Sequence, residues 1–190
     1  MDKRIESIVF DEEAHRYFLG DRELKGITHA IGKYMGKSFP DTDTVMVAKM
    51  LGDTVHKEVE NYYNDSKEVS TESAKWVVNE LKDFMDLLPV AVTGVKCEVM
   101  VSDFETTASK VDVVVHCLDG TCYLFDVKTT SKFDREYCSL QLSVYKRLYE
   151  ACYDEKVMGL YVLGTKMRRL FHIIEQDKAK TDKILSMNRG

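Results

Sequence analysis

Two aspartates and a lysine interrupt apolar runs whose composition favours β-strands. Asp112 stands between valines in residues 111–115, and Asp126 and Lys128 stand in a second run that begins at Tyr123. β-Branched and aromatic residues of this kind are typical of largely buried strands. A carboxylate buried there without a partner would cost several kcal/mol, so a cation should lie against it. Lys128 is one candidate, and a divalent metal is the better one because two carboxylates are present.

The turn between the two runs decides whether the carboxylates meet. Asp119-Gly120 is a strong hairpin signal, and a two-residue turn there would point the two aspartates to opposite faces. A three-residue loop over 118–120 instead places Asp112 opposite Asp126, and its glycine supplies the left-handed residue that such a loop needs. Lys128 then shares their face, since residues two apart on a strand point to the same side. Two carboxylates facing each other at ~5 Å destabilise a sheet unless a cation bridges them, so this register predicts a metal site.

Further short motifs accompany these residues in a fixed order. They are G-x-x-x-H at Gly52–His56, an acidic residue at Glu98, Asp112 itself, D-x-K at Asp126–Lys128, and Q-x-x-x-Y at Gln141–Tyr145. Together they resemble the PD-(D/E)XK nuclease superfamily, in its RecB-like and lambda-type phage exonuclease branch. Residues 8–28 are similar to the N-terminal hairpin of many phage members, and the resemblance covers roughly residues 8–165. No single motif is specific to this superfamily, whereas five motifs in this order are much more specific to it.

The resemblance implies roles for the motif residues. Its catalytic set is Asp112, Asp126, Lys128, Glu98, Gln141 and Tyr145. Its metal, Mg²⁺ or Mn²⁺, is expected on His56, Glu98, Asp112, Asp126 and the carbonyl of Val127, with waters completing the shell. Lys128 would hold the attacking water in line or help to deprotonate it. Gln141 and Tyr145 would orient Lys128 or hold a DNA phosphate, and whether Glu98 and His56 ligate directly stays open.

The chain departs from the family pattern at two positions. The family commonly has glycine three residues before the first aspartate, where this chain has Ser109, and the acidic residue of the D-x-K motif is the shorter Asp126. The first departure bears on how closely DNA approaches the backbone, and the second bears on metal preference.

Residue type alone favours structural roles for several of these side chains. A lone histidine such as His56 beside an apolar helix stripe is usually a hydrogen-bonded residue at the edge of a core, and Glu98 could be an exposed strand residue. Gln141 and Tyr145 share a helix face, and they could be half-buried packing residues. We interpret the remaining histidines as structural, namely His15, His29, His116 and His172.

Composition indicates a soluble globular protein with one domain over residues 1–190. The hydrophobic content is 44%, the charged content is 31%, and no apolar run approaches the length of a membrane span. The five cysteines lack a C-x-x-C pattern and the clustered grouping that holds an iron–sulfur cluster in some relatives, so we expect buried thiols in a reducing cytoplasm and no cluster. The net charge of −5 does not exclude DNA binding, which depends on a local basic face. Two basic groups follow the proposed site: Lys128, Lys132, Arg135, and Lys166, Arg168, Arg169.

The order of apolar patterns predicts an α/β fold with a mixed central sheet flanked by helices. The resemblance adds a restriction-endonuclease-like core preceded by a hairpin and two helices. We expect a hairpin over 5–19, a short helix from Thr28, helices over 43–64, 71–88 and 135–152, strands over 94–102, 109–117, 121–128, 157–164 and 168–174, and a closing helix. The helix over 43–64 should bury the stripe Val47, Leu51, Val55, Val59 and Tyr63.

The paired carboxylates and the family resemblance together imply a metal-dependent deoxyribonuclease that resects DNA ends in phage or bacterial recombination or repair. It would act in the cytoplasm of a bacterium or a phage-infected cell, on linear duplex ends, and with no membrane partner. No G-x-x-x-x-G-K-[ST] motor signature is present, so processive digestion would need a homo-oligomer or a partner such as a recombinase. Two alternatives remain: a structure-specific endonuclease on the same core, and a non-catalytic nucleic-acid- or protein-binding module.

Overall fold

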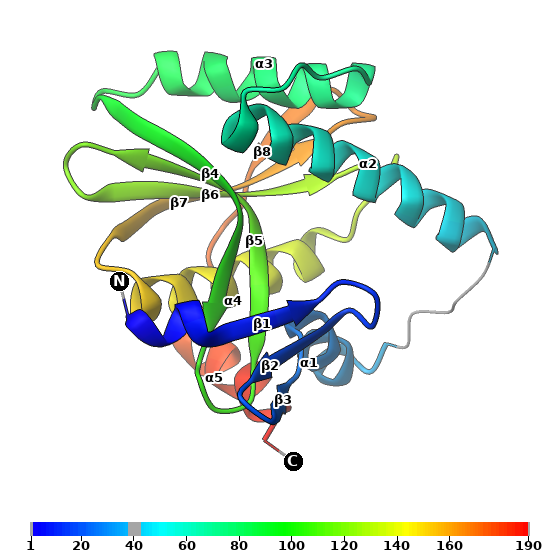
Figure 1. The fold of residues 1–190 in the computed structure, drawn as a ribbon, viewed down its shortest axis with the longest axis vertical. Coiled ribbons are helices and arrows are strands. Elements are labelled where there is room, and N and C mark those ends of the chain that lie inside the picture. The colour runs from blue at the N-terminus through cyan, green and yellow to red at the C-terminus, as the bar shows by residue number, and fades with distance from the viewer. Residues whose placement is uncertain (1, 38–42, 190) are drawn as a thin grey trace.

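A five-stranded mixed sheet forms the centre of the molecule (Figure 1). The computed structural model describes residues 2–37 and 43–189, with the side chains of residues 43–49 outside that description. The strand order is β4-β5-β6-β7-β8, in which β6 and β7 are parallel and the other neighbours are antiparallel. The strands are β4 (Val92–Ser102), β5 (Ala108–Cys117), β6 (Thr121–Lys128), β7 (Lys156–Gly164) and β8 (Arg169–His172). The expected mixed α/β class with a mixed central sheet is confirmed.

Helices cover both faces of this sheet. On one face, α1 (Ile27–Met35), α4 (Arg135–Cys152) and α5 (Lys178–Ser186) pack in a core with Val114, Leu124 and Val162. On the other face, α2 (Asp43–Asp65) and α3 (Glu72–Asp86) pack against Val113, Phe125 and Leu163. Apolar residues thus point alternately to the two faces, as expected for strands buried on both sides.

A smaller three-stranded sheet precedes the central one. It is built from β1 (Ile8–Asp11), β2 (Arg16–Leu19) and β3 (Arg22–Leu24), after the 3₁₀ helix η1 (Lys3–Ser7). The sequence prediction of a hairpin from residue 5 missed both η1 and β3. Tyr17 and Leu24 pack with Phe104 and Ala108 of the β4–β5 region, which ties this sheet to the far end of the β4–β5 pair.

A sharp bend divides β4 and β5 into two halves. Cys97 packs with the α2–α3 core, yet Val99 packs with the α4 core on the opposite side. Between them Glu98 has φ +54°, a left-handed conformation that is unusual for a residue with a side chain. Because Cys97 pairs with Val113 and Val99 pairs with Val111, the bend also includes Asp112 on β5. The bend thereby places Glu98 and Asp112, both partly buried, at the point where the strands change faces.

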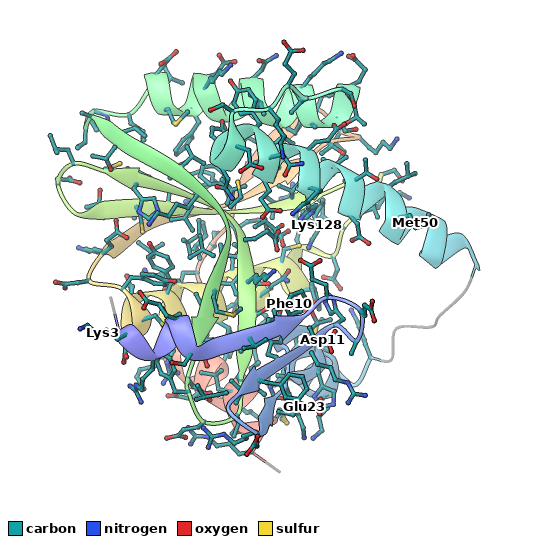
Figure 2. The ribbon with its side chains drawn as sticks, viewed as in Figure 1. Lys3, Phe10, Asp11, Glu23, Met50 and Lys128 are labelled. Atoms are coloured by element: carbon teal, nitrogen blue, oxygen red, sulfur yellow. The ribbon has the colours of Figure 1, made fainter. Side chains whose placement is uncertain are left out.

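The predicted element bounds agree closely with the structure, with one error in burial. Val55 and Val59 of the α2 stripe are buried, but Leu51 is 57% exposed. The N-terminal part of α2 extends beyond the sheet, as the position of Met50 shows in Figure 2, so no core lies beneath Leu51. Val47 lies outside the described side chains.

Within residues 2–37 and 43–189, no helix is both long and apolar enough to cross a bilayer.

Candidate metal and phosphate site

Three side chains from three elements converge beside the bend. His56 of α2, Glu98 of β4 and Asp112 of β5 place one possible ligand atom each within 4.8 Å of the others. Nδ1 of His56 lies 3.7 Å from Oε1 of Glu98 and 3.7 Å from Oδ2 of Asp112. One imidazole nitrogen and two carboxylates at these separations are a donor set that can hold a divalent cation.

The hydrogen bond that Nε2 of His56 makes determines the protonation state of Nδ1. Nε2 lies 3.1 Å from the carbonyl oxygen of Val127, and since a carbonyl only accepts, Nε2 carries the proton and donates. When the imidazole is neutral, Nδ1 therefore carries a lone pair that faces two carboxylates. This arrangement is stable only if Nδ1 binds a proton or a metal ion. Burial favours the neutral ring, but Asp112 and Glu98 outweigh it and raise the pKa of His56 to about 9.

The β5–β6 hairpin has the register that the three-residue loop predicts. Val113 pairs with Phe125 and His116 pairs with Cys122, while Gly120 has φ +78°. The ladder ends at Val113, so Asp112 and Asp126 are next in register.

Beyond the last backbone pair of that ladder, the side chain of Asp112 bonds to the neighbouring strand. Its Oδ2 accepts a hydrogen bond of 2.7 Å from the backbone nitrogen of Val127. Burial raises the pKa of Asp112 to about 7, with His56 opposing this shift and the charges of Asp126 and Glu98 adding to it. A carboxyl in this position is readily neutralised by a proton or by a metal ion.

Asp126 lies apart from the three-residue cluster, against Lys128. The residue is 1% exposed, and Nζ of Lys128 lies 2.9 Å from its Oδ1 and 2.8 Å from its Oδ2. The contact to Oδ1 is a hydrogen bond, whereas Oδ2 receives no well-directed donor among the described residues. Burial lowers the pKa of Lys128, but Asp126 and Asp112 outweigh it and raise the pKa above its usual value, so the side chain is an ammonium ion.

Gln141 and Tyr145 connect Lys128 to the opposite wall of the site. Nζ of Lys128 donates to Oε1 of Gln141 at 3.3 Å, and Nε2 of Gln141 donates to the hydroxyl of Tyr145 at 3.1 Å. The Tyr145 hydroxyl then lies 3.3 Å from Oγ of Ser109. The sequence predicted that Gln141 could orient Lys128, but it assigned no role to the Ser109 hydroxyl, whose contact depends on the packing of α4 over β5.

The convergent residues line a groove of about 1460 Å³. Lys57 and Lys110 also line it, and the sequence reasoning missed both. Nζ of Lys110 lies 3.8 Å from Oε2 of Glu98 and 4.1 Å from the ring centroid of Phe10. Its place two residues before Asp112 on a strand is a signal that could have predicted this side of the groove. Figure 2 places Phe10 on the N-terminal sheet and Lys128 between that sheet and α2.

Gly52 allows α2 to approach the loop that follows β6. A Cβ at this position would lie 3.2 Å from Oγ1 of Thr129, closer than ordinary contact. Since His56 is one turn further along the same helix, the glycine sets how closely His56 approaches Val127. The sequence suggested close packing or a close backbone approach at Gly52, and the structure shows close packing against the Thr129 side chain.

The two basic groups named from the sequence do not line this groove. Arg168 donates to the backbone oxygen of Glu72 at 2.7 Å, and Arg135 and Arg169 lie against the ring of Phe171. The groove lysines are instead Lys33, Lys37, Lys57 and Lys110.

The remaining histidines and cysteines lie in packing positions or on the groove wall. Nδ1 of His116 is 2.8 Å from Glu155, and Nδ1 of His29 is 3.1 Å from Asn188. His15 and His29 are groove-lining residues. The five cysteines are buried free thiols, which agrees with the expected packing role.

Comparison with known proteins identifies no family. No family model and no curated protein matches the chain. A solved structure from Eubacterium rectale, named "Putative exonuclease", is similar over 86% of this chain and 76% of that chain, at 11% identity and a TM-score of 0.39. A similarity at this level assigns neither a family nor an activity, so the functional argument rests on the geometry of the site.

Proposed function

We propose that this chain is a divalent-metal-dependent nuclease of the PD-(D/E)XK type that hydrolyses phosphodiester bonds in DNA. The observation that carries the proposal is the convergence of His56, Glu98 and Asp112 at the wall of one groove, next to the ion pair between Asp126 and Lys128. A cluster of carboxylates that holds a metal, next to a fixed ammonium group, supplies what phosphodiester hydrolysis needs.

The donor set fits Mg²⁺ or Mn²⁺. The Nδ1 lone pair of His56 faces Glu98 and Asp112, and without a cation these groups must take up protons to coexist. His56, Glu98 and Asp112 are the groups that would hold the ion directly, since Asp126 lies against Lys128 and the Val127 carbonyl accepts from Nε2 of His56. When bound, such an ion lowers the pKa of a coordinated water and stabilises negative charge on the phosphate.

Lys128 acts in this proposal as a charged donor. Because Asp126 and Asp112 keep it protonated, it is suited to hold the attacking water in line and to neutralise phosphate charge, and it is unsuited to remove a proton. Asp126 and Gln141 hold its ammonium group from two sides, which limits the directions in which it can point. Of the two roles that the sequence left open, the donor role is therefore the one we propose.

The substrate we propose is linear duplex DNA, digested from its ends. Base-specific cutters need side chains that reach groove edges, usually from added loops or helices, and the connections between elements here are short. We therefore propose an exonuclease in one domain, which would need a homo-oligomer or a recombinase partner for processive digestion.

Matched digests of supercoiled, nicked and linear forms of one plasmid would test this proposal. We expect loss of the linear form in Mg²⁺ or Mn²⁺, with both circular forms largely resistant. Rapid cutting of the closed circle into discrete fragments would support the endonuclease alternative instead. Absence of cutting of all three forms would support the non-catalytic alternative.

A further inference from the structure

Phe171 of β8 holds two guanidinium groups that the proposed function does not use. Cζ of Arg135, the first residue of α4, lies 5.1 Å from the ring centroid, and Cζ of Arg169, the first residue of β8, lies 5.2 Å from it. Phe133 packs edge-on against the same ring, at 5.1 Å between centroids. Two exposed cations from separate elements thus lie against one ring.

Neither guanidinium has an oxygen partner among the described residues. The other arginines each contact an oxygen: Arg4, Arg16, Arg22, Arg147, Arg168 and Arg189. Two like charges gathered on one ring repel each other, and an anion between them removes that repulsion. The pair is therefore suited to an anionic ligand that the chain itself does not supply.

The strand register relates this pair to Lys128. Lys128 pairs with Gly164, and Gly164 pairs with Arg169, so the three form one row across β6, β7 and β8. Residues directly opposite one another point to the same face, which places Lys128 and Arg169 on one side of the sheet. At about 4.8 Å between strands, the two backbone positions are about 10 Å apart.

The middle residue of that row is a buried glycine, Gly164, whose lack of a Cβ leaves room for two neighbouring side chains. A Cβ at Gly164 would lie 2.8 Å from Cε of Met167 and 3.0 Å from the Phe171 ring. The side chains of Met167 and Phe171 therefore fill the space over Gly164, and a nucleic-acid strand that joins Lys128 to the arginine pair would pass over these two side chains.

We propose that Arg135 and Arg169 form a clamp for a backbone phosphate of the nucleic-acid strand whose scissile bond lies at Lys128. This assignment of a substrate contact rests on the proposed nuclease function. Because the two backbone positions are about 10 Å apart, the clamped phosphate lies one or two phosphates along the strand from the bond that is cut. Planar guanidinium forks bind phosphate oxygens in pairs, which a lysine in either position would not do.

Binding without cleavage tests the clamp. The probe is a fluorescent single-stranded oligodeoxynucleotide of about 12 nucleotides, titrated in EDTA and followed by anisotropy over a series of salt concentrations. The double variant R135Q/R169Q is compared with K156Q/K178Q, which removes the same charge at the opposite end of β7 and on α5. We expect R135Q/R169Q to bind about tenfold more weakly, with a slope of log affinity against log salt that is smaller by about 0.7 for each phosphate that is no longer bound. The control variant K156Q/K178Q should change the affinity and the salt slope much less.

The outcomes separate the clamp from the nuclease proposal. If the wild-type protein binds through both arginines but never cuts DNA, the clamp stands and the nuclease function is wrong. If R135Q/R169Q binds as the control does, or if the wild-type protein does not bind the oligonucleotide in EDTA, the clamp is wrong whatever the protein cuts. The single variants R135Q and R169Q, with melting temperatures for each, provide the same test should the double variant not fold.

Discussion

At the scale of single residues, the site is a set of charges that cannot coexist at neutral pH without a proton or a metal ion. Nδ1 of His56 faces Glu98 and Asp112, while Asp126 is neutralised by Lys128. The two aspartates that the sequence predicted as equal ligands are therefore in different electrostatic settings. Each setting predicts a different response to substitution or to pH.

The pH dependence of stability in EDTA should report the cluster directly. The pKa of His56 rises from 6.5 to about 9 on folding, so its stabilising contribution is complete below pH 6.5 and is lost as the pH rises through 9. The pKa of Asp112 rises from 3.8 to about 7, so its contribution also decreases as the pH rises, between about pH 4 and 7. We expect the melting temperature to fall from pH 6 to pH 9 in EDTA and to fall much less in excess Mn²⁺. A melting temperature that rises over this range in EDTA would be inconsistent with the assigned charges.

Removing either aspartate should stop cleavage, with opposite effects on stability. Asp112→Asn relieves repulsion with Glu98 and Asp126, and it should match or exceed the wild-type melting temperature in EDTA at pH 8. Asp126→Asn leaves the partly buried Lys128 ammonium without its counter-charge and should destabilise by about 1–3 kcal/mol. Urea unfolding of both variants at one pH measures the difference, and equal destabilisation would contradict the separate settings of the two carboxylates.

Lys128→Met should reduce turnover far more than DNA affinity. Its role is at the reacting phosphate, and loss of a positioned donor of this kind typically reduces the rate by about 10²- to 10⁴-fold. Lys132→Met, which changes an exposed lysine in the following loop, is the matched control. Single-turnover rates and anisotropy in EDTA separate the two quantities. A loss confined to affinity would make Lys128 a phosphate-binding residue only.

At the scale of elements, the site depends on the packing that places α2, the β4–β5 bend and α4 around one point. Apolar periodicity predicted where these elements lie, since it follows from burial. The left-handed conformation of Glu98 was not predictable, because no local residue preference favours it. The exposure of Leu51 was also missed, because a helical stripe does not reveal where the supporting sheet ends.

The approach of α2 to the loop after β6 can be tested with a rescue pair. Helix propensity alone predicts that Gly52→Ala stabilises α2 by about 1 kcal/mol. The added Cβ would lie 3.2 Å from Oγ1 of Thr129, so we expect α2 and His56 to shift and Mn²⁺ affinity to fall several-fold. Thr129→Ala removes that oxygen, and the double variant should recover affinity in a calorimetric titration. Failure of Thr129→Ala to restore Mn²⁺ binding would show that Gly52 acts in another way.

At the scale of the whole molecule, charge is distributed unevenly in a way that the net value of −5 hides. The carboxylates of Glu98 and Asp112 lie in the groove, while the Arg135–Arg169 pair lies on the start of α4 and on β8, two strands away from β6. The motif order predicted His56, Glu98 and Asp112 as neighbours, but it could not predict Lys110 or the contact of Ser109 with Tyr145. Those contacts join residues whose separation in sequence carries no periodic signal, and they form only when the helices pack on the bent strands.

The central claim is that hydrolysis of DNA requires a divalent ion bound by this cluster. The most direct measurement is the digestion of an end-labelled linear duplex by the wild-type protein and by Asp112→Asn, each in Mn²⁺ and in excess EDTA, with folding verified by melting temperature. The account predicts cleavage only by the wild-type protein in Mn²⁺. Comparable cleavage in EDTA, or by folded Asp112→Asn in Mn²⁺, would contradict it.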